Sequence, residues 1–382
     1  MWSQSKIKFI LLLLIFYVSA GCAQQKSENN KFDFLEVDSI IYNGITEKAF
    51  PGAALLINLD GKTIYKKGFG NFTYDSDSPD VNPSTIYDLA SLTKVIATTT
   101  AAMICIDKNY FNLDDKVEKY IPEFGTNEKE NITIRNLLLH NSGLPAWKKF
   151  YNKNLTKKQI LSDVYSSELD YKTGSKTVYS DLGMIVLGKI IEKVTNASLD
   201  KFCEKEIFKP LKMNDTFFNP PDSVKYRIPP TENDTYWRNR LIKGEVHDET
   251  ASLLGGVSGH AGLFSNVENI EKFLLMILNK GVYQNKKLIN SETIDLFTKR
   301  QSQESSRALG WDTKSETGSS AGNLFGKNSF GHTGFTGTSI WVDPDRNLFV
   351  VFLTNRVYPS RENKKLLSIR PKLHDAVIRA ID

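Results

Sequence analysis

The stretch SLTKVIATTTAAMICI, residues 91–106, combines the start of a predicted helix with the first candidate for catalysis. Ser91 and Lys94 are three residues apart, so on a helix their side chains lie one above the other. The lysine amine can then take the proton of the serine, whose hydroxyl is a poor nucleophile without a base. At a helix N-terminus, Ser91 would also lie beside free backbone N–H groups and the positive end of the helix dipole.

The pattern S-x-x-K is weak evidence on its own, because it occurs four times in the chain. Two copies lie within the first eight residues, and Ser198 with Lys201 is typical of an N-cap that opens the helix SLDKFCEKEIF. Only Ser91 is followed, in a plausible order, by further groups that could take part in catalysis.

The first of these groups is Tyr179-Ser180-Asp181, in the stretch KTVYSDLGMIVLG. A phenol near a cationic lysine can serve as a general acid or base. Asp181 could hold Lys94 or a substrate amide. The alternative is that Tyr179 is an ordinary core aromatic at the start of an apolar helix, which is the simpler interpretation of this segment alone.

The second group is Gly331-His332-Thr333-Gly334, directly before the predicted strand FTGTSIWVD. Glycines let a backbone come close to a ligand, and the following strand could offer an N–H group to a developing oxyanion. His332 and Thr333 can donate hydrogen bonds to a substrate carboxylate. The alternative is a glycine-rich strand entrance with an exposed histidine.

Taken in order, S-x-x-K, Y-S-D and H-T-G resemble the serine β-lactamase and penicillin-binding-protein superfamily. The segments TIYDLASLTK, ITIRNLLLHNSGLP, YSDLGMIVLG and GGVSGHAGLFS are similar to its class C β-lactamase branch, which includes DD-peptidases and esterases. The resemblance extends from about Phe34 to the C-terminus. It implies a β-lactamase/transpeptidase-like fold and is specific for the superfamily, but not for a substrate.

The resemblance also implies roles for individual residues. Ser91 would be the acylated nucleophile, Lys94 its proton acceptor and Tyr179 the shared acid and base. The backbone N–H groups of Ser91 and Phe335 would form the oxyanion hole, and His332 and Thr333 would contact the substrate carboxylate. The full set of expected substrate-binding residues is Asp181, His332, Thr333, Gly334 and Phe335.

Two positions depart from the common family pattern. Asp181 stands where Asn is more usual, which could alter amide binding or the charge on Lys94. His332 replaces the lysine of the K-T-G form, and H-T-G resembles certain DD-carboxypeptidases and esterase-like members. Because a histidine has a reference pKa of about 6.5, we expect weak β-lactam hydrolysis. For the same reason we expect activity on carboxylate-bearing substrates to rise as the pH falls toward about 6.

The order of predicted elements indicates an α+β fold. A helical pattern over 34–48 is followed by the strands AALLINL and TIYKKGFG, which meet at the hairpin signal Asp60-Gly61. Residues 91–297 are mainly helical, strands return in TSIWVDP and NLFVVFLTN, and a helix covers 362–381. We therefore expect an antiparallel sheet from both chain ends (about 34–90 and 300–382), flanked by helices. A helical region (about 91–299) would be inserted, with a cleft where the two regions meet.

The N-terminus predicts export and a lipid anchor. Lys6 and Lys8 precede an apolar run over 9–18, which is too short to span a bilayer but suits a signal peptide. Small residues before Cys22 resemble a bacterial lipobox, although Ser19 stands where Leu or Val is usual. We expect a signal peptide over 1–21, lipidation at Cys22 and a polar tether over 22–33. The hydrolase domain, over 34–382, would then be membrane-anchored and face the periplasm or the cell surface.

Composition excludes several other classes. The formal charge is +5 and falls to +3 once the two lysines of residues 1–21 are removed, which is too weak for a nucleic-acid partner. Cys105 and Cys203 are predicted to be buried thiols. His247-Asp248 with His260 could suggest a metal site, but no third ligand has suitable spacing. We expect no metal and no cofactor, and a monomer.

The hypothesis favoured by these patterns is a periplasmic serine hydrolase that forms an acyl-enzyme on Ser91. Its substrate would be a D-alanyl peptide from the cell wall, as for a DD-carboxypeptidase. A class C-like β-lactamase and a broad esterase are alternatives that use the same residues. A different class is a penicillin-sensing lipoprotein that is acylated but hardly turns over.

Overall fold

The computed structural model describes residues 32–382, and the elements below belong to a unit from Phe34 to Asp382. The predicted sheet from both chain ends is confirmed. It has the strand order β10-β11-β12-β13-β1-β2, and all neighbouring strands are antiparallel. The strands are β1 (Gly52–Leu59), β2 (Lys62–Gly70), β10 (Asp312–Thr313), β11 (Phe330–Thr333), β12 (Ser339–Asp343) and β13 (Leu348–Thr354).

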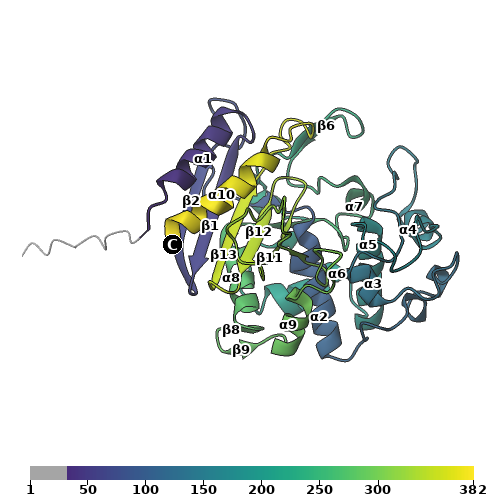
Figure 1. The fold of residues 1–382 in the computed structure, drawn as a ribbon. Helices are drawn as coiled ribbons and strands as arrows, with labels where there is room; N and C mark the ends of the chain where they lie inside the picture. Colours follow the sequence, from purple (N-terminus) through teal and green to yellow (C-terminus); the bar gives the residue numbers. More distant parts are fainter. Residues whose placement is uncertain (1–31) are drawn as a thin grey trace, which may run out of the picture. The chain divides into compact units, whose positions relative to one another are not determined.

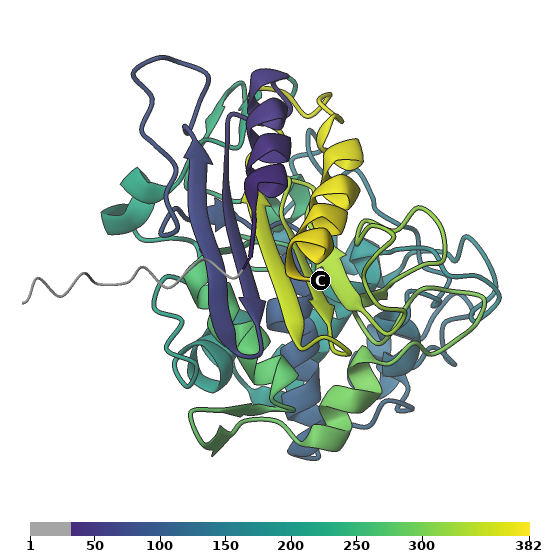
Figure 2. The same cartoon turned by 60° about the vertical axis from the view of Figure 1, so that its left-hand side comes forward.

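Helices cover both faces of this sheet. The helices α1 (Leu35–Thr46) and α10 (Leu366–Ile381) lie side by side across one face, as Figures 1 and 2 show. Their apolar sides bury a cluster that includes Val37, Trp341 and Val377. Helix α8 (Val267–Leu278) packs against β1 and β13 on the opposite face. Because β1 and β13 are covered on both faces, their sequences are almost continuously apolar rather than alternating.

The segment between the sheet's two halves contains most of the helices, as predicted. They are α2 (Thr100–Asp107), α3 (Ile134–Leu138), α4 (Lys157–Tyr165), α5 (Asp181–Thr195), α6 (Leu199–Cys203), α7 (Glu249–Leu253), α8 and α9 (Ser291–Thr298). Shorter helical turns are η1 (Lys94–Thr99), η2 (Val117–Lys119), η3 (Pro122–Phe124), η4 (Glu204–Phe208) and η5 (Asp222–Arg227). Their apolar sides share one large core with the inner face of the sheet.

The sequence did not predict the short strands of this segment. They are β3 (Tyr87–Asp88), β4 (Phe217–Phe218), β5 (Glu232–Asp234), β6 (Arg240–Ile242), β7 (Leu263–Ser265), β8 (Val282–Tyr283) and β9 (Lys286–Lys287). Strand β7 pairs with both β3 and β4. This pairing places the residues just before Ser91 beside the segment that follows His260.

Two local expectations need correction. The helix after Ser91 does not start as a regular α-helix, because its first turns, from Lys94 to Thr99, are π-helical. The residues Phe330–Thr333 precede strand β12, as predicted, but they also form a strand of their own, β11, which pairs with β12 so that His332 lies opposite Ile340. Gly331 fits there because a Cβ would lie 2.3 Å from the carbonyl oxygen of Ile340.

A search of residues 32–382 finds no helix that is both long enough and apolar enough to cross a membrane. The predicted signal peptide and Cys22 lie outside the described residues.

Candidate active site

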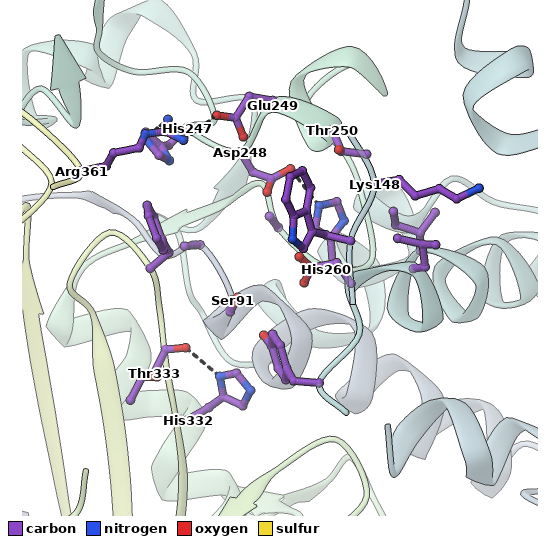
Figure 3. A pocket seen from close by; sticks show the side chains of 18 of the residues that line it. Ser91, Lys148, His247, Asp248, Glu249, Thr250, His260, His332, Thr333 and Arg361 are labelled. Atoms are coloured by element: carbon purple, nitrogen blue, oxygen red, sulfur yellow. Dashed lines mark hydrogen bonds and ion pairs between the residues drawn. The ribbon is translucent and has the colours of Figure 1, made fainter. Parts of the chain in front are cut away.

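Ser91 lines a cavity of about 590 Å³ between the sheet and the inserted region. The cavity also contains Tyr179, Asp181, His332 and Thr333, which come from segments far apart in the sequence. Figure 3 shows Ser91 in the middle of the cavity, with His332 and Thr333 on one side and a row of polar residues on the other. The structure thus brings together the candidate residues of all three sequence motifs.

Lys94 is completely buried and makes three short contacts. Its Nζ atom lies 2.9 Å from Ser91 Oγ, 2.8 Å from the carbonyl oxygen of His260 and 2.8 Å from Asp181 Oδ1. The carbonyl and the carboxylate can only accept hydrogen bonds, so Lys94 must donate to both. In a neutral amine the remaining lone pair would therefore point at the Ser91 hydroxyl, which is the geometry that a general base needs.

The charge of Lys94 is set mainly by burial and by Asp181. Burial alone would lower the pKa of Lys94, but the attraction of the Asp181 carboxylate more than offsets it, so that the pKa is raised. The resting enzyme therefore holds Lys94 as an ammonium ion near neutral pH. This ion must lose a proton before the amine can accept the proton of Ser91.

Tyr179 is positioned by its neighbours on both sides. The backbone N–H of Ser180 donates to His140 Nδ1 at 3.1 Å, and Ser180 Oγ accepts from Gly183 and so caps α5. The ring of His140 packs against that of Tyr179 at 4.8 Å, as expected for a structural histidine. The sequence did not indicate that Ser180 and His140 fix the position of Tyr179.

The hydroxyl of Tyr179 is buried and close enough to Lys94 and Ser91 to interact with both, although neither contact has the geometry of a full hydrogen bond. Burial raises the pKa of Tyr179, and the nearby Lys94, whose Nζ lies 4.8 Å from the ring centre, opposes this only in part. The resting phenol is therefore neutral. An unpartnered buried hydroxyl is costly, so this group is available to a substrate or to a proton in transit between Ser91 and Lys94.

The surroundings of His332 favour a neutral ring. Its Nδ1 lies 2.8 Å from the carbonyl oxygen of Thr333, so Nδ1 must carry the proton. Burial, helped by Arg307 and Lys94, holds the pKa of His332 well below its usual value. The ring is therefore neutral, and its Nε2 is a buried lone pair without a partner. With Nδ1–H bonded to the Thr333 carbonyl, this neutral ring has no free N–H to donate to a carboxylate.

Arg307 is the cation that the sequence analysis missed. It lines the cavity, and its guanidinium lies 5.1 Å from the centre of the Tyr179 ring. It sits in an irregular stretch, and no motif marks it. Its charge also acts on His332, the neighbour of Thr333, and a guanidinium is suited to bind a carboxylate.

The turn between β11 and β12 is tied to the segment that leads into Ser91. Thr336 Oγ1 donates to the carbonyl of Asp88 at 2.7 Å, and Thr338 Oγ1 donates to that of Leu89 at 3.0 Å. Gly334 lies so close that a Cβ would be 2.5 Å from the carbonyl oxygen of Leu89. These contacts bring the backbone at Phe335 toward Ser91, as the expected oxyanion hole requires.

The structure places a third potential metal ligand beside His260 and Asp248, although the sequence spacing indicated none. Asp181, Asp248 and His260 have ligand atoms within 4.8 Å of one another. However, Asp181 is already paired with Lys94, and Asp248 accepts a hydrogen bond from His260 at 2.8 Å. Ser258 holds the other ring nitrogen of His260 at 2.9 Å. The cluster thus fixes the loop whose carbonyl oxygen holds Lys94.

The family model of beta-lactamases matches residues 37–371. The chain belongs to the Beta-lactamase family. It is 35% identical over 357 residues to "N-acetylmuramyl-L-alanine amidase" of Bacillus subtilis, covering 84% of this chain and 80% of the relative. It is 34% identical over 341 residues to "Putative D-alanyl-D-alanine carboxypeptidase" of Escherichia coli K12, and this match covers 80% of this chain and 79% of the relative.

A solved structure supports the fold. The hydrolase EstCE1, described as having promiscuous acyltransferase activity, superposes with a TM-score of 0.72 at 23% identity. The superposition covers 90% of this chain and 97% of that protein. The β-lactamase-like α+β fold expected from the sequence is therefore confirmed, and the chain is a serine hydrolase of this family.

Proposed function

We propose that the protein hydrolyses an amide bond to an alanine in cell-wall peptides, through an acyl-enzyme on Ser91. The observation that carries the proposal is the set of three contacts around Lys94, which direct the amine at the Ser91 hydroxyl. D-alanyl-D-alanine ends are the first substrates to test, because several relatives are named for that activity. The Bacillus relative is named for an amide of L-alanine.

The reaction starts from the form in which Lys94 has lost one proton to solvent. In the first half, Ser91 Oγ attacks the amide carbon while its proton passes to the neutral Lys94 amine, directly or through the Tyr179 hydroxyl. The backbone N–H groups of Ser91 and Phe335 stabilise the oxyanion. The proton then moves to the amide nitrogen, the C–N bond breaks and the amine leaves. In the second half, a water molecule gives up a proton to the same pair and attacks the ester, which releases the acid and restores Ser91.

The leaving alanine carries a carboxylate when it is the C-terminal residue. Thr333 lies beside His332 in the cavity (Figure 3), and the charge of Arg307, which lines the same cavity, acts on His332. The two residues can supply a hydrogen-bond donor and a cation for this carboxylate. His332 has no available donor, which distinguishes this site from one with lysine at the same position. We expect penicillins to be turned over slowly for this reason.

Time-resolved labelling with a fluorescent penicillin tests the proposal, run beside a D-alanyl-D-alanine peptide and a p-nitrophenyl ester. Release of D-alanine that is lost in Ser91→Ala supports a carboxypeptidase. Rapid loss of the label with drug hydrolysis would indicate a β-lactamase, and nitrophenol release alone an esterase. Stable labelling without any turnover would indicate a penicillin sensor.

A further inference from the structure

The cavity contains exposed aromatic surface. Trp147 is 61% exposed and Phe335 is 48% exposed, and both line the cavity together with Tyr151. Large aromatic side chains exposed in a pocket lose the free energy that burial would provide, and such surfaces commonly mark binding sites. The fold alone does not require apolar rings here.

Ring contacts connect Tyr151 and Phe335 to further aromatic residues, and Trp147 lines the same cavity. Tyr151 packs against Tyr236 and Trp237, each with ring centroids 5.7 Å apart. The Arg361 guanidinium lies 4.3 Å from the Tyr236 ring centre and 6.0 Å from that of Phe335. We call the residues Trp147, Tyr151, Tyr236, Trp237, Phe335 and Arg361 the aromatic wall.

Hydrogen bonds and ion pairs hold Phe335, Tyr236 and Arg361 in the aromatic wall. Glu232 binds Arg361 at 2.6 Å and His247 at 2.8 Å, and Phe335 stacks on the His247 ring with an interplanar angle of 22°. Burial would raise the pKa of Glu232, but hydrogen bonds from His247 and Arg361 lower it to about 2. Glu249 also pairs with Arg361, at 2.9 Å. The wall is therefore preorganised, which reduces the entropy cost of binding.

Hydrogen-bonding groups surround the exposed rings. Lys148, Glu249, Thr250 and Arg361 line the same cavity, and Figure 3 shows them on the side away from His332. A wholly apolar guest would leave these groups without partners, at a cost in free energy. A pyranose ring suits both features, because its C–H face can lie on an aromatic ring while its hydroxyl groups form a polar edge.

We propose that the aromatic wall binds a pyranose ring of the substrate, on the acyl side of the scissile amide. The inference rests on the proposed function, in which Arg307 and Thr333 hold the leaving alanine at the opposite side. Phe335 supplies both a ring of the wall and a backbone N–H of the expected oxyanion hole, so the sugar must lie next to the reacting carbonyl. The substrate class is thus an amide between a sugar-borne carboxylic acid and alanine.

A matched pair of substrates tests this inference. N-acetylmuramyl-L-alanine has a pyranose next to the amide, whereas (R)-2-methoxypropanoyl-L-alanine has the same amide without the sugar. We expect kcat/KM to be about 100-fold higher for the sugar-bearing substrate, given the contributions of aromatic contacts. Equal values for the two substrates would overturn the inference.

The variant Trp147→Ala should reduce the ratio of these two kcat/KM values by about 10-fold. Tyr226→Ala removes an aromatic ring that is 73% exposed but outside the cavity, and it should leave the ratio unchanged. If Trp147→Ala lowers both kcat/KM values in the same proportion, the wall does not recognise the sugar.

A binding measurement separates this inference from the proposed function. Titration of Ser91→Ala with free N-acetylmuramic acid, followed by tryptophan fluorescence or calorimetry, should saturate, and adding Trp147→Ala should weaken binding about 10-fold. Saturable binding without turnover of any alanine amide would refute the proposed function alone. Absence of saturable binding, or binding that Trp147→Ala does not weaken, would refute the pyranose subsite.

Discussion

At the scale of single residues, the pairing of Lys94 with Asp181 distinguishes this site most clearly. An Asn at position 181 could satisfy the amine without a charge, whereas the carboxylate also stabilises the ammonium form of Lys94. The carboxylate can only accept hydrogen bonds, so a substrate carbonyl placed near it would be repelled. Asp181 therefore affects both the proton on Lys94 and the choice of substrate.

Replacing Asp181 with Asn should shift the pH dependence of acylation. Asp181 raises the pKa of Lys94, so its removal lowers that pKa and the amine becomes a base at lower pH. We expect the rise of kcat/KM with pH to move to lower pH in Asp181→Asn, measured with a neutral p-nitrophenyl ester. An unchanged pH profile would show that the ionisation of Lys94 does not determine the rise of kcat/KM with pH.

His332 should remain neutral throughout the usual assay range, because burial keeps its pKa well below 6.5. We therefore expect the ratio of kcat/KM for a carboxylate-bearing substrate to that for a neutral ester to be constant from about pH 5.5 to 8.5. The two profiles can be recorded with the same preparation. If the ratio rises as the pH falls toward 6, then His332 becomes charged in this range, as the sequence suggested.

We expect Arg307, rather than His332, to bind the substrate carboxylate. Arg307→Ala is expected to raise KM for a D-alanyl-D-alanine peptide by about 10-fold to 100-fold, the usual effect of losing a charge-assisted hydrogen bond. The effect on a neutral ester should be much smaller. Equal losses on both substrates would mean that Arg307 acts by supporting Tyr179, over whose ring it lies.

Much of the site was predictable at this scale, because Ser91, Lys94 and Tyr179 belong to short motifs with fixed chemistry. Arg307 was not predictable, since it lies in an irregular stretch and reaches the cavity only through tertiary structure. The tautomer of His332 depends on a backbone carbonyl and on burial, and neither can be read from residue types. The proximity of Asp181 to His260 was unpredictable for a similar reason, because α5 and the loop before β7 meet only in the folded chain.

At the scale of elements, we expect the contact between the β11–β12 turn and the segment before Ser91 to determine the position of the proposed oxyanion hole. A Cβ at Gly334 would lie 2.1 Å from Thr338 Oγ1 and 2.5 Å from the carbonyl oxygen of Leu89. We expect Gly334→Ala to force the turn away from Ser91. Its kcat should fall by about 100-fold or more, the usual effect of losing an oxyanion donor.

Gly183→Ala is the matched control for this substitution. A Cβ at Gly183, on α5, would meet its nearest atom at 3.7 Å, which is an ordinary contact. Alanine also has the higher helix propensity, by about 1 kcal/mol. Thermal unfolding should therefore show Gly183→Ala to be at least as stable as the wild type, with activity retained. A Gly334→Ala enzyme with normal kcat would show that the turn does not position the oxyanion hole.

The sequence predicted long elements better than short ones. The hairpin of β1 and β2 follows from Asp60-Gly61 between apolar runs, and β13 follows from a continuous apolar stretch. Strand β11 was missed as a strand because Phe330–Thr333 is short and contains a glycine, and only its pairing with β12 makes it extended. The π-helical turns after Lys94 leave no signal in residue type, since Thr98 and Thr99 suit several conformations.

At the scale of the whole molecule, the predicted export and lipid anchor depend on residues 1–31. We propose that the protein is anchored through Cys22, because small residues precede this cysteine as in a bacterial lipobox. Cys22→Ala should then move the protein from the membrane pellet to the soluble fraction after cell lysis. If the wild-type protein is already soluble, the lipobox interpretation fails at Ser19.

The central claim is that Ser91 becomes acylated during turnover. The most direct measurement is intact-mass spectrometry of enzyme quenched while it hydrolyses a slow ester or a penicillin, followed by peptide mapping. We predict an adduct with the mass of the acyl group on the peptide that contains Ser91, and neither adduct nor turnover in Ser91→Ala. Turnover by Ser91→Ala, or an adduct on another residue, would contradict the account.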